Sequence, residues 1–317
     1  MYLIDDAVII EVLGIRMYAF GAYVALGALC ATAVIGVMAR YWKLKPGTAP
    51  LTALLSAVCG IVVSRLAFCL LNQDLNMFEY LHAWPQLSGG GWSMFGLIGG
   101  VYLGGLISAK IMKEKTGRIF DILSLALLPL MAAERMGDSR IDDFDVSRAL
   151  DSEFLKNSFL AVKEGEPVLA TYYVAAFVMV VLFVVLLIRA CRKHEKEGSL
   201  TVAFLLLFGA ASIILESLRY DFFLSISFVG LQQVAAALTL GLGVILAARR
   251  SNRPKSGLAI AAYISLPLMV GAVIGLEFAL DRTNWNKFLV YILMIITVCI
   301  PAVLGMKLLG KGSKDRE

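Results

Sequence analysis

Long apolar runs alternate with short polar connections along almost the whole chain. A helix needs about 20 mainly apolar residues to cross a bilayer, and most of these runs are about that long. The pattern predicts membrane-spanning helices at residues 17–39, 48–71, 93–112, 119–136, 168–190, 199–218, 228–248, 257–279 and 286–309. We therefore expect an all-α, polytopic membrane protein with nine spanning helices.

The fourth apolar run, 119–136, is shorter than the others and contains Pro129. Proline removes a backbone donor and clashes with the preceding helical turn. This helix is therefore expected to be kinked or partly re-entrant. Asp121 lies near its start and is expected to cap it.

Basic residues concentrate in every second connection, which sets the expected orientation. Cytoplasmic loops of membrane proteins are enriched in Lys and Arg. Here the basic residues fall at 40–45, 110–118, 189–196, 249–255 and 307–316. The second connection, 72–92, contains no Lys or Arg. The alternation predicts an N-terminus outside the cell and a cytoplasmic C-terminus.

The composition agrees with this class of protein. Of the 317 residues, 59% are hydrophobic and 17% are charged, whereas soluble domains carry roughly a quarter charged residues. The net charge of +5 comes from the basic connections, so it indicates topology and not nucleic-acid binding. Four of the five cysteines fall inside apolar runs and the fifth, Cys191, directly follows one, so no disulfide framework is expected. They are Cys30, Cys59, Cys69, Cys191 and Cys299.

Polar side chains interrupt several spans near the ends that this orientation places outside. An ionisable residue at membrane depth is energetically unfavourable and by default marks a functional site. The polar residues are Tyr18, Arg65, Ser93, Glu134, Arg135, Glu216, Arg219, Gln232 and Gln233. Ordinary alternatives exist, because an Arg near a helix end can extend to the headgroups and Glu216 and Arg219 can neutralise each other at i, i+3. Since six helices contribute at one depth, we expect a shared site in the outer leaflet.

The residue types in this set favour a phosphate-containing ligand. A guanidinium group bonds two phosphate oxygens at once, and a neighbouring carboxylate can hold the arginine or accept a proton. Phospholipid headgroups place phosphate at this depth. The sequence therefore predicts chemistry on a phospholipid, or its transport. No phosphate-binding loop and no metal-ligand spacing is present, so neither a metal nor another cofactor is expected.

Short motifs along the chain resemble, in the same order, those of the prolipoprotein diacylglyceryl transferase family, bacterial membrane enzymes that lipidate lipoprotein precursors. IRMYAFGAY at 15–23 is similar to the family's Ile-Arg-Trp-Tyr-Gly, and GGWSMFGLIGG at 90–100 is similar to Gly-Gly-Met-Ser-Phe-His-Gly-Gly-Leu-Ile-Gly. The other similar stretches are SRLAFCLLN at 64–72, ERMGDSRIDD at 134–143, PVLATYY at 167–173, FGAASIILESLRYD at 208–221 and FVGLQQ at 228–233.

The resemblance covers about residues 14–248, and it implies a domain organisation. A seven-helix, transferase-like membrane domain is expected at 1–250, with an external segment at 137–167. The remainder, 251–317, is expected to form an extra two-helix membrane hairpin and a cytoplasmic tail.

The resemblance also implies an activity and its residues. The family transfers an sn-1,2-diacylglyceryl group from phosphatidylglycerol to the cysteine thiol of a prolipoprotein signal peptide, so this chain is expected to act in the bacterial plasma membrane with those two partners. Catalytic roles are implied for Tyr18, Arg135, Asp143 and Glu216. Phosphatidylglycerol binding is implied for Arg65, Ser93, Arg135, Asp138, Arg219 and Gln232.

Three positions depart from the family pattern. Phe95 stands in place of a histidine in the third helix, Asp138 in place of an asparagine, and Ser212 in place of an arginine in the sixth helix. Because no histidine lies in a predicted helix, Glu216 or Asp143 is expected to orient the arginines and take the thiol proton. The losses favour an alternative, a non-catalytic relative that binds or moves a phospholipid or thiol compound. A general secondary transporter fits less well, since no inverted repeat is apparent.

Overall fold

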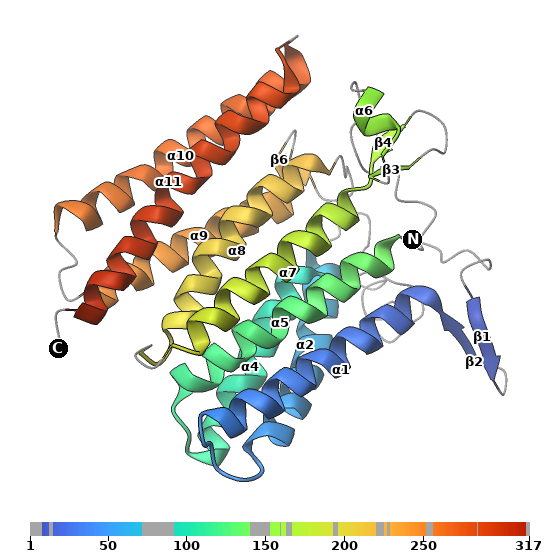
Figure 1. Cartoon of the computed structure of the whole chain (residues 1–317), viewed down its shortest axis with the longest axis vertical. Coiled ribbons are helices and arrows are strands. Elements are labelled where there is room, and N and C mark those ends of the chain that lie inside the picture. Colours follow the sequence, from blue (N-terminus) through green and yellow to red (C-terminus); the bar gives the residue numbers. More distant parts are fainter. Residues whose placement is uncertain are drawn as a thin grey trace. The chain divides into compact units, whose positions relative to one another are not determined.

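The computed structural model describes residues 8–12, 15–71, 92–139, 153–158, 160–162, 167–192, 196–219, 225–226, 229–251, 256–283 and 285–314. Within these ranges, 9 helices are long and apolar enough to cross a membrane. They are α1 (Ala19–Tyr41), α2 (Thr48–Leu71), α4 (Met94–Met112), α5 (Thr116–Asp138), α7 (Thr171–Ala190), α8 (Ser199–Leu218), α9 (Leu231–Arg250), α10 (Gly257–Arg282) and α11 (Lys287–Lys314) (Figure 1). The chain is a polytopic, all-α membrane protein, as the hydropathy pattern predicts.

Short elements join some of the long helices. α6 (Glu153–Lys156) is a single turn. The strands pair as antiparallel ladders, each of two strands. These ladders are β1 (Val8–Val12) with β2 (Ile15–Tyr18), β3 (Ala161–Val162) with β4 (Val168–Leu169), and β5 (Ser225–Ile226) with β6 (Val229–Gly230). The first ladder leads directly into α1.

α5 is longer than the sequence predicts. It continues through Pro129 and extends past both ends of the expected span 119–136. The expectation of a short, partly re-entrant segment was wrong, and the alternative of a kink stays a prediction. At 1.5 Å per residue, its 23 residues extend for about 34 Å, which is enough to cross the hydrocarbon core. Asp121 is buried inside the helix. The N-cap residue is Lys115, so the expected capping role of Asp121 was also wrong.

The chain forms two compact units, Met1–Val184 and Val185–Glu317, and each is described by itself. In the first unit, α2 packs along α4, α1 packs along α5, and α4 also contacts α5. In the second unit, α8 packs along α9, while α11 lies against α8, α9 and α10. The predicted boundary at residue 250 separates a family-like part from an extension, and it stays a prediction.

The most buried spanning helix of each unit carries predicted site residues. In α5 and α8, 61% and 72% of the most apolar stretch is buried. Other helices expose large apolar side chains, such as Leu29 on α1, Phe177 on α7 and Leu268 on α10. Exposed apolar faces on a chain of this class are the surfaces that face lipid. The charged residues of α5 and α8 are therefore held on helices that their neighbours cover.

Glycines bring α2 and α4 into backbone contact. A Cβ atom added at Gly100 would collide with the Cys59 backbone, and one added at Gly104 would collide with the Leu55 backbone. Small residues spaced four apart on one helix face allow such close packing in lipid. We call this contact the α2–α4 seam.

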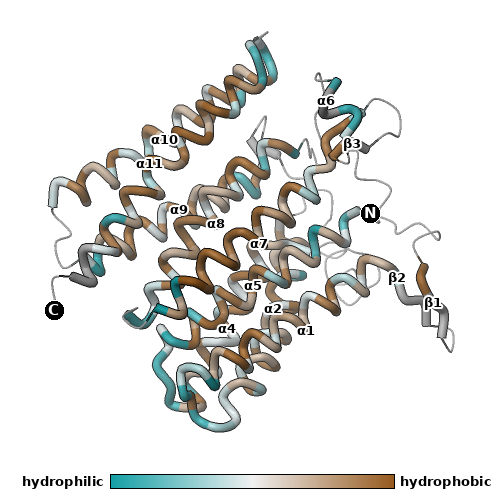
Figure 2. The backbone as a smooth tube through the Cα atoms, in the orientation of Figure 1, coloured by the Kyte–Doolittle hydropathy of each residue, from teal (hydrophilic) through white to brown (hydrophobic). Residues whose placement is uncertain are grey.

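The basic connections gather at one end of each unit. In the first unit, the Lys45 Nζ atom donates to the carbonyl oxygens of Met112 and Lys113, both at 3.0 Å. In the second unit, Nη1 of Arg250 donates to the Glu197 carbonyl oxygen at 2.7 Å. Figure 2 shows hydrophilic segments at helix ends and hydrophobic residues along the helices. The arrangement agrees with the alternation of basic connections, while the expected cytoplasmic location of this end stays a prediction.

The α2–α4 seam gives a first test. Gly100→Ala is expected to destabilise the protein by about 1–3 kcal/mol, because the new methyl group must displace the Cys59 backbone. Gly99→Ala is the matched control, since nothing lies within 4 Å of a Cβ atom at that position. Thermal unfolding in detergent micelles measures both. Equal stability of the two variants would contradict backbone contact at the seam.

Candidate functional site

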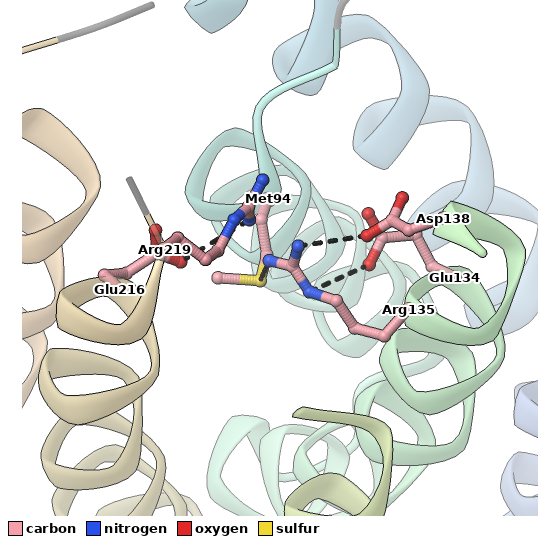
Figure 3. Close-up of polar contacts among 6 residues, drawn as sticks. All are labelled: Met94, Glu134, Arg135, Asp138, Glu216 and Arg219. Atoms are coloured by element: carbon pink, nitrogen blue, oxygen red, sulfur yellow. Dashed lines mark hydrogen bonds and ion pairs between the residues drawn. The ribbon is translucent and has the colours of Figure 1, made fainter. Parts of the chain in front are cut away.

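Arg135, near the end of α5, has two carboxylates beside its guanidinium group. Nη1 donates to Oδ2 of Asp138 at 3.2 Å, and Nε lies 3.5 Å from Oε2 of Glu134 (Figure 3). Nη2 lies 3.4 Å from the sulfur of Met94, the first residue of α4. Arg135 and Asp138 are 7% and 5% exposed. Because the pair is buried, its charges are stable only when the partners are well oriented. We call these four residues the Arg135 cluster.

Arg65 is buried near the end of α2, with a different kind of neighbour. Its guanidinium carbon lies 5.7 Å from the centre of the Phe68 ring and 5.8 Å from that of Trp92. Aromatic faces attract a cation at this distance. The hydroxyl of the adjacent Ser64 donates to the Ser93 carbonyl oxygen at 2.8 Å. The Ser93 backbone N–H donates in turn to the Ser64 carbonyl oxygen at 3.3 Å. These two bonds tie the end of α2 to the start of α4.

Two of the predicted site residues occupy helix starts. The Ser93 hydroxyl oxygen accepts from the Gly96 backbone N–H at 3.1 Å and so caps α4; its predicted contact with lipid stays a prediction. Tyr18 precedes α1 in an extended conformation. A Cβ atom added at Gly137 of α5 would lie 3.0 Å from the Phe20 ring of α1, so the start of α1 lies against the end of α5.

The first unit therefore gathers predicted site residues at one end, away from its basic connections. They are Tyr18, Arg65, Ser93, Arg135 and Asp138. The two buried arginines approach the same short segment of backbone, because Arg65 contacts Trp92 and Arg135 contacts Met94.

In the second unit, Glu216 in the last turn of α8 is held from two sides. Its Oε1 lies 4.0 Å from Nη1 of Arg219, and both side chains are 10% exposed (Figure 3). With its amide nitrogen turned toward α8, Gln232 donates to both oxygens of Glu216, at 3.1 and 3.2 Å. Glu216, Arg219 and Gln232 form what we call the Glu216 cluster. It lies at the opposite end of α8 from the basic connection that precedes this helix.

A second polar layer lies beside the Glu216 cluster. Nε2 of Gln233 donates to Oε1 of Glu277 at 2.8 Å and to the Ile213 carbonyl oxygen at 3.4 Å. Glu277 belongs to α10 and is 4% exposed. The sequence analysis assigns it no role, although a single carboxylate inside the apolar span 257–279 is the signal that could have found it.

The remaining sequence predictions have different outcomes. Asp143, together with residues 140–152 of the expected external segment, lies outside the described residues, so its catalytic role stays a prediction. Since the two units are described separately, the shared site of the Arg135 and Glu216 clusters also stays a prediction. Within the described ranges, no group of three or more His, Cys, Asp and Glu side chains is placed to hold a metal ion.

Paired ionisable groups inside spanning helices define a membrane protein with a polar working region, as in membrane enzymes and transporters. This chain belongs to the prolipoprotein diacylglyceryl transferase family, whose model matches residues 7–277. The match contains both clusters and most of α10. It confirms the family resemblance of the motifs, so prolipoprotein diacylglyceryl transfer is the activity of the family to which the chain belongs. No curated protein matches the chain.

The buried pair of Arg135 and Asp138 gives a second prediction. Asp138→Ala is expected to destabilise the protein by about 1–3 kcal/mol. Removing one partner of a buried ion pair typically destabilises a protein by about 3–5 kcal/mol. The expected loss is smaller here because Glu134 still lies 3.5 Å from the guanidinium group. The double variant Arg135→Met/Asp138→Ala is expected to be more stable than the sum of the two single changes predicts. Unfolding curves of all four proteins measure the coupling, and simple additivity would contradict the pairing.

Proposed function

We propose that the protein transfers an sn-1,2-diacylglyceryl group from phosphatidylglycerol to the cysteine thiol of a prolipoprotein signal peptide, at the outer face of the bacterial plasma membrane. One observation carries the proposal beyond family membership. Two buried arginines, Arg65 and Arg135, both contact the start of α4, at Trp92 and Met94. Two guanidinium groups near one segment suit a ligand that carries a phosphate.

The two arginines have different parts in this proposal. The rings of Phe68 and Trp92 attract the Arg65 cation and hold it at the end of α2, and we assign to Arg65 attraction of the lipid phosphate. Asp138 and Glu134 hold the guanidinium group of Arg135 in one orientation, so its N–H groups point in fixed directions. Fixed donors that face a developing negative charge are an effective source of transition-state stabilisation.

The reaction replaces one bond at a glycerol carbon. The thiol sulfur forms a bond to the diacylglycerol carbon that carries the phosphate, and the carbon–oxygen bond breaks. Its electron pair leaves with glycerol phosphate, whose charge Arg65 and Arg135 stabilise. A free thiol has a pKa of about 8.5, so a base must take its proton, and we assign that step to Glu216 or Asp143. Arg219 and Gln232 orient Glu216 through the contacts of its cluster.

A second candidate function is a relative that binds phosphatidylglycerol and has lost the transfer reaction. The observation that favours it is the pairing of Arg135 with two carboxylates, which compete with a phosphate for the same N–H groups. Phe95 and Ser212, in place of the His and Arg implied by the resemblance, favour it as well. The two functions differ in one measurable property, which is the labelling of a peptide.

The phosphate roles predict a large loss of activity. Arg65→Ala and Arg135→Ala are each expected to lower transfer by about a hundredfold or more, the usual effect of removing one charge-stabilising donor. The assay follows radiolabelled diacylglyceryl transfer from phosphatidylglycerol to a lipobox peptide in nanodiscs. Lys110→Ala is the control, because Lys110 is exposed at the other end of α4.

Two results would decide against parts of this proposal. Unchanged transfer by a correctly inserted Arg135→Ala protein would refute its role at the phosphate. A wild-type protein that binds phosphatidylglycerol vesicles but labels no peptide would support the second candidate function.

A shared site of the two clusters predicts coupled effects on turnover. Residues that act as a unit are non-additive, so Arg135→Gln and Glu216→Gln together are expected to lower kcat little more than the stronger single change. The control cycle pairs Arg135→Gln with Asp281→Asn, an exposed carboxylate of α10, and its effects should multiply. If the first cycle is multiplicative too, the two clusters act in separate surroundings.

A further inference from the structure

The last turn of α8 is where Glu216 lies, and it needs external support. The final carbonyl groups of a helix have no partner within that helix. α8 ends at Leu218, and Arg219 already has an extended backbone. The Arg219 backbone N–H donates to the Glu216 carbonyl oxygen at 3.2 Å, and the other terminal carbonyl groups of α8 depend on partners from outside the helix.

The hairpin of α10 and α11 supplies one such bond directly. The hydroxyl of Tyr291, in the first turns of α11, donates to the Ser217 carbonyl oxygen at 3.2 Å. Ser217 follows Glu216 in the chain and is buried. This bond joins one of the terminal carbonyl groups of α8 to a helix that packs along α8.

The same hairpin supplies a second, indirect bond through α9. Glu277 of α10 accepts from Gln233, whose amide also donates to the Ile213 carbonyl oxygen of α8. Neighbouring residues on a helix point about 100° apart, so Gln233 can face α10 while Gln232 faces Glu216. Holding Gln233 therefore sets the rotation of the first turn of α9, and with it the direction of the Gln232 amide.

The choice of a carboxylate at position 277 has a physical reason. A buried amide donor needs an acceptor, and a carboxylate oxygen is a strong one. An apolar side chain would leave Gln233 with only the longer bond to Ile213. A carboxylate within a spanning helix is otherwise unfavourable, so this position is explained by the bond it makes.

We infer that Glu277 and Tyr291 are positioning residues for Glu216, and that the α10–α11 hairpin orients the acidic group of the transfer site. The inference rests on the proposed function of Glu216. The hairpin holds the last turn of α8 through the Ser217 carbonyl and the first turn of α9 through Gln233. Without these bonds, the carboxylate of Glu216 loses its fixed direction, while Arg65 and Arg135 keep theirs.

The first test measures the support itself, without reference to activity. Glu277→Met and Tyr291→Phe each remove one bond with little change in size, because methionine has no oxygen that accepts from Gln233. Amide hydrogen exchange of residues 215–219, measured by mass spectrometry in nanodiscs, is expected to be faster in both variants. The matched controls are Asp281→Asn, an exposed acid one turn further along α10, and Tyr263→Phe, for which no hydrogen bond is found among the described residues. Both controls should exchange like the wild type.

The second test measures the consequence for transfer. Each variant is expected to lower kcat about tenfold, in line with the effect of a small misplacement of a reacting group, with KM for the lipobox peptide unchanged. Glu277→Gln keeps an oxygen that accepts from Gln233 and leaves the Gln233 bond to Ile213 in place, so it is expected to retain most of the wild-type kcat. A purely structural role of Glu277 would show as lower thermal stability without this split between kcat and KM.

The outcomes separate this inference from the proposed function. Wild-type exchange at 215–219 in both variants overturns the inference, and if Glu277→Met fails to insert, Tyr291→Phe alone decides. Faster exchange with unchanged kcat also overturns it as a positioning role. Unchanged turnover in Glu216→Gln would instead overturn the proposed function of Glu216, while the exchange data would still support the contacts of the hairpin with α8.

Discussion

A polar group inside the hydrocarbon layer has no water to bond, so other protein groups must satisfy it. Three groups of contacts among the described residues follow this constraint. Arg135 is paired with Asp138 and Glu134, Glu216 with Arg219 and Gln232, and Gln233 with Glu277. The contacts lie near helix ends, so they also fix where those ends stand within each unit. The bonds that stabilise these charges in the membrane are therefore the same bonds that form the Arg135 cluster and the Glu216 cluster.

The two buried arginines of the first unit, Arg65 and Arg135, have different kinds of neighbours. Arg65 lies near two aromatic rings, whose faces attract its cation. Arg135 faces carboxylates, which orient it and offset its charge. Acids that hold a cation give it a defined geometry. The transfer that we propose occurs at a glycerol carbon, and it needs both attraction of an anionic headgroup and a fixed donor for the departing phosphate.

Much of the architecture could be predicted from the sequence, because spanning segments are long and apolar and basic loops alternate. The ends of α5 were missed because residues 116–118 and Asp138 are too polar for hydropathy to include, although Asp138 is neutralised by Arg135. The site was predicted as residue types at one depth, and within each unit these residues do lie near one end. The pairing of Glu216 with Arg219 follows from their i, i+3 spacing. The pairing of Gln233 with Glu277, or of Tyr291 with Ser217, could not be predicted, because it joins distant parts of the chain.

The α2–α4 seam bears on how a lipid could reach the buried arginines. At Gly100 and Gly104 there is no room for even one added carbon atom between the two backbones. An acyl chain is far thicker than that, so it cannot slide sideways between these two helices. Any lipid that enters the first unit from the bilayer must therefore pass along a helix boundary other than the one between α2 and α4.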